Sequence, residues 1–236
     1  ATLRNSRGGA VPSVLDAVDV CLRAGAQGIT VHPRADERHI TAADVTDIAA
    51  RLARAPGIQF NIEGDPRPDL IDRVLAVRPT QCTLVPVTPG EITSHAGWSA
   101  DTSPERLTAI IKRLQFEGIR VSLFVDPQEA PIRWAKRLGA DRVELYTEPF
   151  AKDFAHGAAM ARSAFEVYAA AARLAHTLGL GVNAGHDLDL DNLVLFREVP
   201  HLAEVSIGHA LISRALFAGL EPVVREYLDV LAGRRP

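Results

Sequence analysis

The stretch Thr177-Leu-Gly-Leu-Gly-Val-Asn-Ala-Gly-His186 joins the end of one predicted helix to a short strand. A glycine after the last helical turn favours the left-handed conformation that closes a helix. The same order of helix, glycine and strand recurs after Arg23-Ala-Gly25, Phe116-Glu-Gly118 and Arg137-Leu-Gly139. This alternation is typical of βα units that build a parallel sheet.

Seven short runs are apolar over most of their length, as expected for parallel strands covered on both faces. Between them lie eight predicted helical segments, one of which begins with Ser103 as N-cap and Pro104 at its first position. The segment from Pro149 to Leu180 is too long for one ordinary connection and predicts an additional helix at about 154–161. The predicted strands cover 28–33, 58–63, 81–86, 121–126, 142–147, 181–186 and 203–209.

The chain opens with a predicted helix, 11–24, that no predicted strand precedes. Because a closed β/α barrel needs eight strands, we expect one domain, 1–236, with the α/β fold of a (β/α)8 TIM barrel carrying additional helices. Its first strand would lie before Ala1, and residues 1–9 would form the following loop. An open seven-stranded sheet is the alternative.

The 236 residues are 47% hydrophobic, which suits a large core and excludes a disordered chain. A net charge of −3 argues against a nucleic-acid partner. Without an apolar stretch of membrane-spanning length or a signal-peptide pattern, we expect no membrane association and a cytoplasmic location. Cys21 and Cys82 lie in apolar stretches without metal-type spacing, which fits free thiols in a reducing compartment.

The carboxyl ends of barrel strands are where active sites form. Four side chains able to transfer protons near neutral pH lie at or near such ends: His32, Glu63, Glu144 and His186. Each of these four residues could instead have a purely structural role. His32 could cap its strand and Glu63 could be a solvated loop charge, while Glu144 could face an arginine of a covering helix and His186 could be packing. Because these groups exceed what a barrel rim needs for solvation, we interpret them as catalytic.

Glycine and histidine occur together after the last two predicted strands, in Gly185-His-Asp187 and Gly208-His-Ala210. Loops at this place in a barrel commonly bind phosphate through backbone N–H groups. A second cationic group lies in Arg34-Ala-Asp-Glu-Arg-His39, with Arg4 and Arg7 in the opening loop. Two such regions predict two phosphates, or one substrate with a phosphate at each end.

None of the lysines Lys112, Lys136 and Lys152 ends a strand, which argues against a Schiff-base aldolase. The sequence has no glycine-rich dinucleotide loop and no Walker motif, so we expect no nucleotide cofactor. Two alternatives stay open. One is a metal-dependent isomerase or hydrolase with the four rim residues as ligands. The other is a barrel that binds a phosphosugar without catalysis.

Several segments resemble the pyridoxine 5′-phosphate synthase family, in order along essentially the whole chain. The patterns His-x-Arg-x-Asp-x-Arg-His-Ile, from His32, and Asn-Ala-Gly-His, from Asn183, are the most specific. The resemblance implies a β/α barrel with additional helices, a homo-octamer, and no metal or other cofactor. It implies closure of the pyridine ring of vitamin B6 from 1-deoxy-D-xylulose 5-phosphate and 3-amino-2-oxopropyl phosphate, with release of phosphate and water. The matching segments are 1–8, 29–40, 61–63, 84–86, 121–126, 182–186 and 206–210.

The same resemblance implies a role for each site residue. His32 and Glu63 would accept protons, His186 would donate one, and Glu144 would stabilise the transition state. The remaining residues would bind the two substrates. These are Arg34, His39 and Thr93 for the deoxyxylulose phosphate, and Arg7, Asp187, Gly208 and His209 for the aminoketone phosphate.

Three features depart from the family pattern. The family's first strand carries an Asn-x-Asp-His element, which would precede Ala1. Asp187 stands where some relatives have glycine, and Ser94-His-Ala-Gly-Trp98 replaces the commoner Thr-Glu-Gly-Gly loop. Because the chemistry needs water to be excluded, we expect a lid, and the loop 88–103 is the candidate.

Overall fold

The computed structural model describes residues 1–87 and 93–234. Within them, seven parallel strands are hydrogen-bonded in chain order from β1 to β7. All seven predicted strands are confirmed, with ends that differ by up to three residues. The strands are β1 (Gly28–Val31), β2 (Gln59–Gly64), β3 (Gln81–Leu84), β4 (Arg120–Val125), β5 (Arg142–Tyr146), β6 (Gly181–Gly185) and β7 (Leu202–Ser206).

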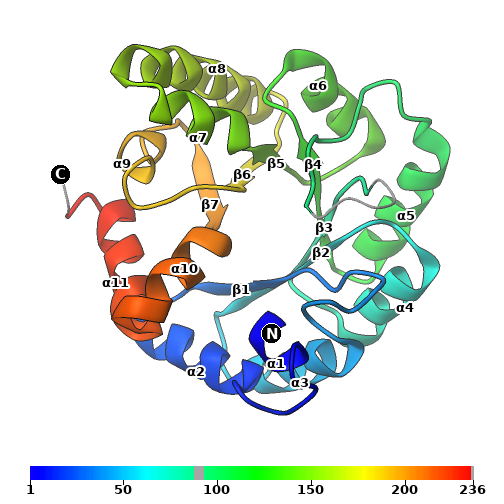
Figure 1. The fold of residues 1–236 in the computed structure, drawn as a ribbon. Helices are drawn as coiled ribbons and strands as arrows, with labels where there is room; N and C mark the ends of the chain where they lie inside the picture. The colour runs from blue at the N-terminus through cyan, green and yellow to red at the C-terminus, as the bar shows by residue number, and fades with distance from the viewer. Residues whose placement is uncertain (88–92, 235–236) are drawn as a thin grey trace.

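Helices alternate with the strands and form an outer ring around them (Figure 1). The last helix, α11, contacts α2, so the two ends of this ring meet. Among the described helices, none has both the length and the apolar character needed to cross a bilayer. The helices are α1 (Thr2–Asn5), α2 (Val14–Ala24), α3 (Ala42–Leu52), α4 (Pro68–Val77), α5 (Pro104–Phe116), α6 (Glu129–Leu138), α7 (Glu148–Ala155), α8 (Ala158–Thr177), α9 (Leu193–Phe196), α10 (His209–Ala218) and α11 (Leu220–Leu231).

The strands curve into a nearly closed barrel of the TIM type, as Figure 1 shows along its axis. Strands β1 and β7 form the two edges, and no ladder joins them within the described residues. Their inward side chains nevertheless approach each other, since Thr30 Oγ1 lies 3.4 Å from Ser206 Oγ. The structure therefore lies between the two expectations: the sheet has seven strands and two free edges within the described residues, but it curves into a nearly closed barrel. Residues 1–9 are not purely a loop, because they contain the four-residue helix α1.

The additional helix exists, but the predicted range 154–161 is wrong. It is α7, which begins directly after Thr147 with Pro149 in its first turn, where the missing N–H of proline costs nothing. Gly157, with φ of 114°, separates α7 from α8. Ser103 is the N-cap of α5 as predicted, but its hydroxyl donates to the Glu105 carboxylate and caps no helix amide.

Alternation along the strands separates an apolar shell from a polar barrel interior. On β5, Val143 and Leu145 are fully buried in the core between strands and helices. Arg142 and Glu144 point the other way, and they bond to Asn183 on the neighbouring β6 and to Thr83 on β3. Successive strand side chains point to opposite faces, and barrel interiors usually hold branched apolar residues. Here the interior holds amide, hydroxyl and charged groups.

Candidate active site

His32 directly follows β1, and Glu63 lies on β2, the neighbouring strand. His32 Nδ1 is 3.9 Å from Glu63 Oε2. Burial, reinforced by the positive charge of Arg34, lowers the pKa of His32 to about 3. Burial raises the pKa of Glu63 to about 7, although Arg34 opposes the rise. The imidazole is thus neutral, and its buried Nε2 has no hydrogen-bond partner among the described residues.

Glu144 is 3% exposed and faces the barrel interior, not an arginine of a covering helix. One oxygen, Oε2, lies 3.4 Å from Thr83 Oγ1 on β3. The other fits against Gly185 of β6, where an added Cβ would come within 2.5 Å of Oε1. Burial first, and then the charge of Glu63, raises the pKa of Glu144 well above its ordinary value. Glu144 therefore connects the Glu63 side of the barrel to the β6 side.

His186 follows β6 and has a hydroxyl partner from a distant loop. Its Nε2 lies 2.9 Å from Thr93 Oγ1, and its ring meets the ring of Tyr146 edge-on at 5.2 Å. Asp187 Oδ2 lies 3.2 Å from His186 Nδ1, although that nitrogen makes no aligned hydrogen bond among the described residues. His186 and Asp187 have φ of 92° and 59°, so the chain turns sharply after the strand. Strain of this kind commonly occurs at functional sites.

The predicted cationic group lies beside His32. Arg34 is 9% exposed, and its charge acts on both His32 and Glu63. Burial lowers the pKa of His39, and the charges of Arg38 and Arg34 add to the effect. The opening segment lies over this loop, because Asn5 Nδ2 donates to the carbonyl of His39 at 2.7 Å.

Arg4 forms an ion pair with Asp44 at the start of α3, whereas Arg7, the predicted phosphate ligand, is exposed. Gly208 is the N-cap of α10, and His209 is its first residue. Both are exposed, and His209 Nε2 lies 3.5 Å from Ser213 Oγ in its own helix. Their backbone could receive an anion at the helix N-terminus, but the structure shows no contact that joins them to the carboxylates.

The predicted lid, 88–103, is described only from residue 93 onward. Its second half packs on the strand ends, where Trp98 Nε1 donates to the carbonyl of Leu84 at 2.9 Å. Gly97 lies so close to β4 that a Cβ would be 2.4 Å from Val125 Cα, so only glycine fits there. Closure of this loop stays a prediction.

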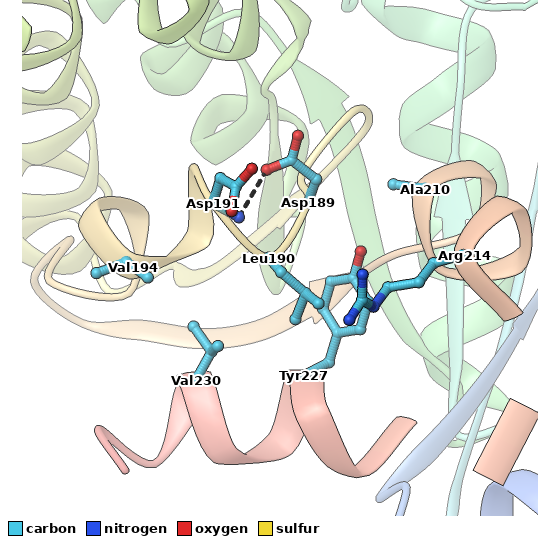
Figure 2. Close-up of a pocket in the computed structure, with 8 residues that line it drawn as sticks. All are labelled: Asp189, Leu190, Asp191, Val194, Ala210, Arg214, Tyr227 and Val230. Carbon is cyan, nitrogen blue, oxygen red and sulfur yellow. Dashed lines mark hydrogen bonds between the residues drawn. The ribbon is translucent and has the colours of Figure 1, made fainter. Parts of the chain in front are cut away.

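A cavity of about 380 Å³ lies outside this cluster, between the loop after β6 and helices α9, α10 and α11 (Figure 2). Asp189 and Asp191 line it, and its one lining arginine, Arg214, bonds to Glu226 at 2.6 Å. These walls do not suit a phosphate. In the described part of the chain, no group of three or more histidine, cysteine, aspartate or glutamate side chains could hold a metal ion.

Sequence reasoning missed several residues that connect the site. Asn61 donates to Glu63 Oε1 at 3.3 Å, and Thr83 Oγ1 lies 3.1 Å from Asn61 Oδ1. Asn61 and Glu63 are two apart on one strand, so period-2 alternation could have placed both side chains inside the barrel. Tyr146, two residues after Glu144, could have been found in the same way.

A nearly closed β/α barrel with histidines and buried carboxyls at its strand ends has the architecture of a TIM-barrel enzyme. Comparison with known proteins agrees. Residues 1–233 match the family described as "Pyridoxal phosphate biosynthesis protein PdxJ", and the chain belongs to that family.

Curated relatives carry the name pyridoxine 5′-phosphate synthase. The protein from Christiangramia forsetii is 51% identical over 232 residues, which cover 98% of this chain and 95% of the relative. The protein from Porphyromonas gingivalis is 50% identical over 233 residues with the same coverage, and the one from Xanthomonas campestris pv. campestris is 49% identical over 241 residues, which cover 99% of this chain and 93% of the relative.

Solved structures are similar in fold alone. A thiamine phosphate pyrophosphorylase from Pyrococcus furiosus has a TM-score of 0.58 at 14% identity, covering 94% of this chain and 91% of that one. A 3-hexulose-6-phosphate synthase has a TM-score of 0.61 at 13% identity, covering 92% of each chain.

Proposed function

We propose that this chain condenses 1-deoxy-D-xylulose 5-phosphate with 3-amino-2-oxopropyl phosphate to pyridoxine 5′-phosphate, phosphate and water. The curated relatives named pyridoxine 5′-phosphate synthase align with this chain over 95% of their own length. The observation that carries the chemistry is the set of differently protonated groups around one barrel end. Ring closure needs an amine to attack a ketone, protons to leave carbon, and hydroxyl and phosphate to depart. Each positioned acid or base contributes a factor of about 10²–10⁴ to such steps.

His32 and Glu63 are the proposed proton acceptors. His32 is neutral at neutral pH because burial lowers its pKa to about 3, and its Nε2 is not engaged by another described residue. Burial brings the pKa of Glu63 to about 7, where a carboxylate is both present and a useful base. The proposed proton donor is His186, which Thr93 contacts at Nε2. Glu144 would stabilise the developing transition state as a buried acid.

The cationic groups fit two phosphorylated substrates. Arg34 and His39, with Thr93, would bind the deoxyxylulose phosphate beside His32. The aminoketone phosphate would lie nearer β6 and β7, on the backbone of Asp187 and Gly208, with the remaining predicted ligands Arg7 and His209. The Asp187 carboxylate must then point away from the phosphate, and its approach to His186 Nδ1 agrees with such an orientation.

We further propose that the enzyme works in the cytoplasm as a homo-octamer and uses no cofactor. Light scattering on the purified protein at several concentrations tests the assembly, and a stable monomer would contradict it. Turnover measured with EDTA tests the metal-dependent alternative. Substrate binding without phosphate release would favour the binding-only barrel.

The decisive assay mixes both substrates and follows pyridine absorbance and phosphate release. Glu63→Gln and His186→Asn are expected to reduce kcat by about 10²–10⁴ each, the range of a lost acid or base. Glu166→Gln and His156→Asn, at exposed positions of helix α8 and at the end of α7, are the matched controls and should keep full activity. Unchanged rates in both site variants would refute the assignment.

A further inference from the structure

Thr83 lies in the polar barrel interior, and the proposed function gives it no role. It lies on β3, and its side chain is fully buried. Its hydroxyl is within hydrogen-bond distance of three groups: Asn61 Oδ1 at 3.1 Å, Glu144 Oε2 at 3.4 Å and Gln81 Nε2 at 3.4 Å. These three groups come from three different strands, β2, β5 and β3.

The direction of these hydrogen bonds is set by Arg120, at the N-terminal end of β4. A guanidinium can only donate, and Arg120 Nε lies 2.9 Å from Gln81 Oε1. The Gln81 amide therefore presents its oxygen to Arg120 and its NH₂ group to Thr83. It follows that Thr83 accepts a hydrogen bond from Gln81.

A hydroxyl has one hydrogen to donate and two lone pairs. The shorter of the two remaining contacts of Thr83 is to Asn61 Oδ1, a carbonyl oxygen that can only accept. Asn61 Nδ2 then donates to Glu63 Oε1 at 3.3 Å. With its hydrogen used in this way, Thr83 is left to accept from Glu144, whereas a Thr83 hydroxyl that donated to Glu144 would lower the pKa of that carboxyl. Glu144 must then carry a proton on Oε2.

We propose that Thr83 is a positioning residue that holds one proton on Glu144, so that the two buried carboxyls carry a single negative charge, on Glu63. A side-chain amide does not transfer protons. The hydrogen bonds through Asn61 therefore determine which carboxyl holds the proton, and they do not carry that proton from one carboxyl to the other. The inference rests on the proposed function only for its effect on turnover.

The charges around Glu63 and Glu144 also favour a proton on Glu144 and a negative charge on Glu63. The charged groups that act on Glu144 are Glu63 and Glu204, both acidic, and burial is the largest cause of its raised pKa. Glu63 faces the cation Arg34, which favours its ionised form, and the neutral ring of His32 lies 3.9 Å away. The neighbouring Cys82 stays a thiol, because burial and the charge of Glu63 raise its pKa to about 12. Of the two carboxyls, Glu63 is thus the one that ionises first.

Infrared difference spectra of the whole, substrate-free protein against pH test this directly, because a protonated carboxyl has its own C=O band. The wild-type protein should keep such a band above about pH 8, where Glu63, with its pKa of about 7, is ionised, and Glu144→Gln should remove it. Thr83→Val, which has nearly the same shape and no hydroxyl, should lower the pH at which the band disappears by about 1 unit, the equivalent of one hydrogen bond. Thr83→Ser should restore the wild-type midpoint.

Ser122→Ala is the matched control. Ser122 lies opposite Thr83 on β4, is fully buried, and its Oγ has no hydrogen-bond partner within the described residues. Its removal should leave the midpoint unchanged. A midpoint that rises in Thr83→Val would mean that Thr83 donates to an ionised Glu144 and would overturn the proposal. A band above about pH 8 that Glu63→Gln removes would overturn it as well.

If Thr83→Val does not fold, the thermal stability of Glu144→Gln tests whether Glu144 is protonated. A glutamine amide can donate to Thr83 Oγ1 as the protonated acid does, so Tm should stay near the wild-type value. A large loss of Tm would contradict a protonated Glu144. None of these measurements uses substrate. A wild-type protein that makes no pyridoxine 5′-phosphate would therefore refute the proposed function and leave this inference standing.

Discussion

Gly185→Ala tests the position of Glu144 by steric means. The new Cβ would lie 2.5 Å from Glu144 Oε1, about 0.9 Å closer than the 3.4 Å at which ordinary contact begins. The Glu144 carboxyl has to move by roughly this distance to relieve the clash. The other atoms near the new Cβ belong to Ser206, at 3.2 and 3.4 Å, and moving them would not relieve it. A displacement near 1 Å can cost about 10²-fold in rate, or about 2.7 kcal/mol in the activation free energy.

Steady-state kinetics with both substrates, together with thermal unfolding, measure the two consequences. We expect kcat to fall about 10²-fold and the free energy of unfolding to fall by about 1–3 kcal/mol, the usual effect of overpacking. Gly9→Ala is the control, because a Cβ there has no heavy atom within 4 Å and the residue is not in the positive-φ region. In a Glu144→Asp background the shorter side chain should relieve the clash, which a double-mutant cycle on stability would detect. Full kcat in Gly185→Ala with unchanged Tm would show that Glu144 does not occupy this position.

Three further predictions concern pH and stability. The folded pKa of Glu63, about 7, lies above its unfolded value, so its contribution to stability is complete at low pH and disappears as pH rises through 7. The same ionisation should give kcat/KM a limb rising near pH 7, and Glu63→Gln should remove both the limb and the stability slope. The folded pKa of His32, about 3, lies below its unfolded value, so His32→Asn should remove a loss of stability that sets in as pH falls below about 6.5. Phe150→Ala should lower the free energy of unfolding by about 3–5 kcal/mol, because the ring is fully buried and contacts the rings of three other aromatic residues. Phe116→Ala, at a side chain 88% exposed, should change it by less than about 0.5 kcal/mol in urea unfolding. Equal losses of unfolding free energy in Phe150→Ala and Phe116→Ala would contradict the packing described for Phe150.

The seven strands and their order could be predicted because both depend on local information. Short apolar runs, glycines at helix ends and the rule that consecutive βα units lie side by side are all readable along the chain. The position of α7 was harder, because the proline and glycine that delimit it favour several starts equally well. Its actual start after Thr147 buries Phe150 against Tyr168 and Phe196, which are distant in sequence.

The candidate site was predicted as a set of residue types and not as a set of contacts. Glu144 could have faced a helix or the barrel interior. Only the structure shows which face of β5 is turned toward the interior. Thr83 gave no indication at all, because a threonine in a strand is ordinary. Its contact with Glu144 joins residues 61 positions apart in the chain.

The sequence by itself thus determined the alternation of helices and strands, the family, and the residue types at the barrel rim. Only the tertiary structure decided which of those groups are neutral and which are charged. Secondary structure follows from hydrogen bonds and steric preferences between near neighbours. Protonation depends on burial and on charges that curvature of the sheet brings together. The pKa of Glu63 near 7 and the neutral ring of His32 exist only once the fold buries both side chains beside Arg34.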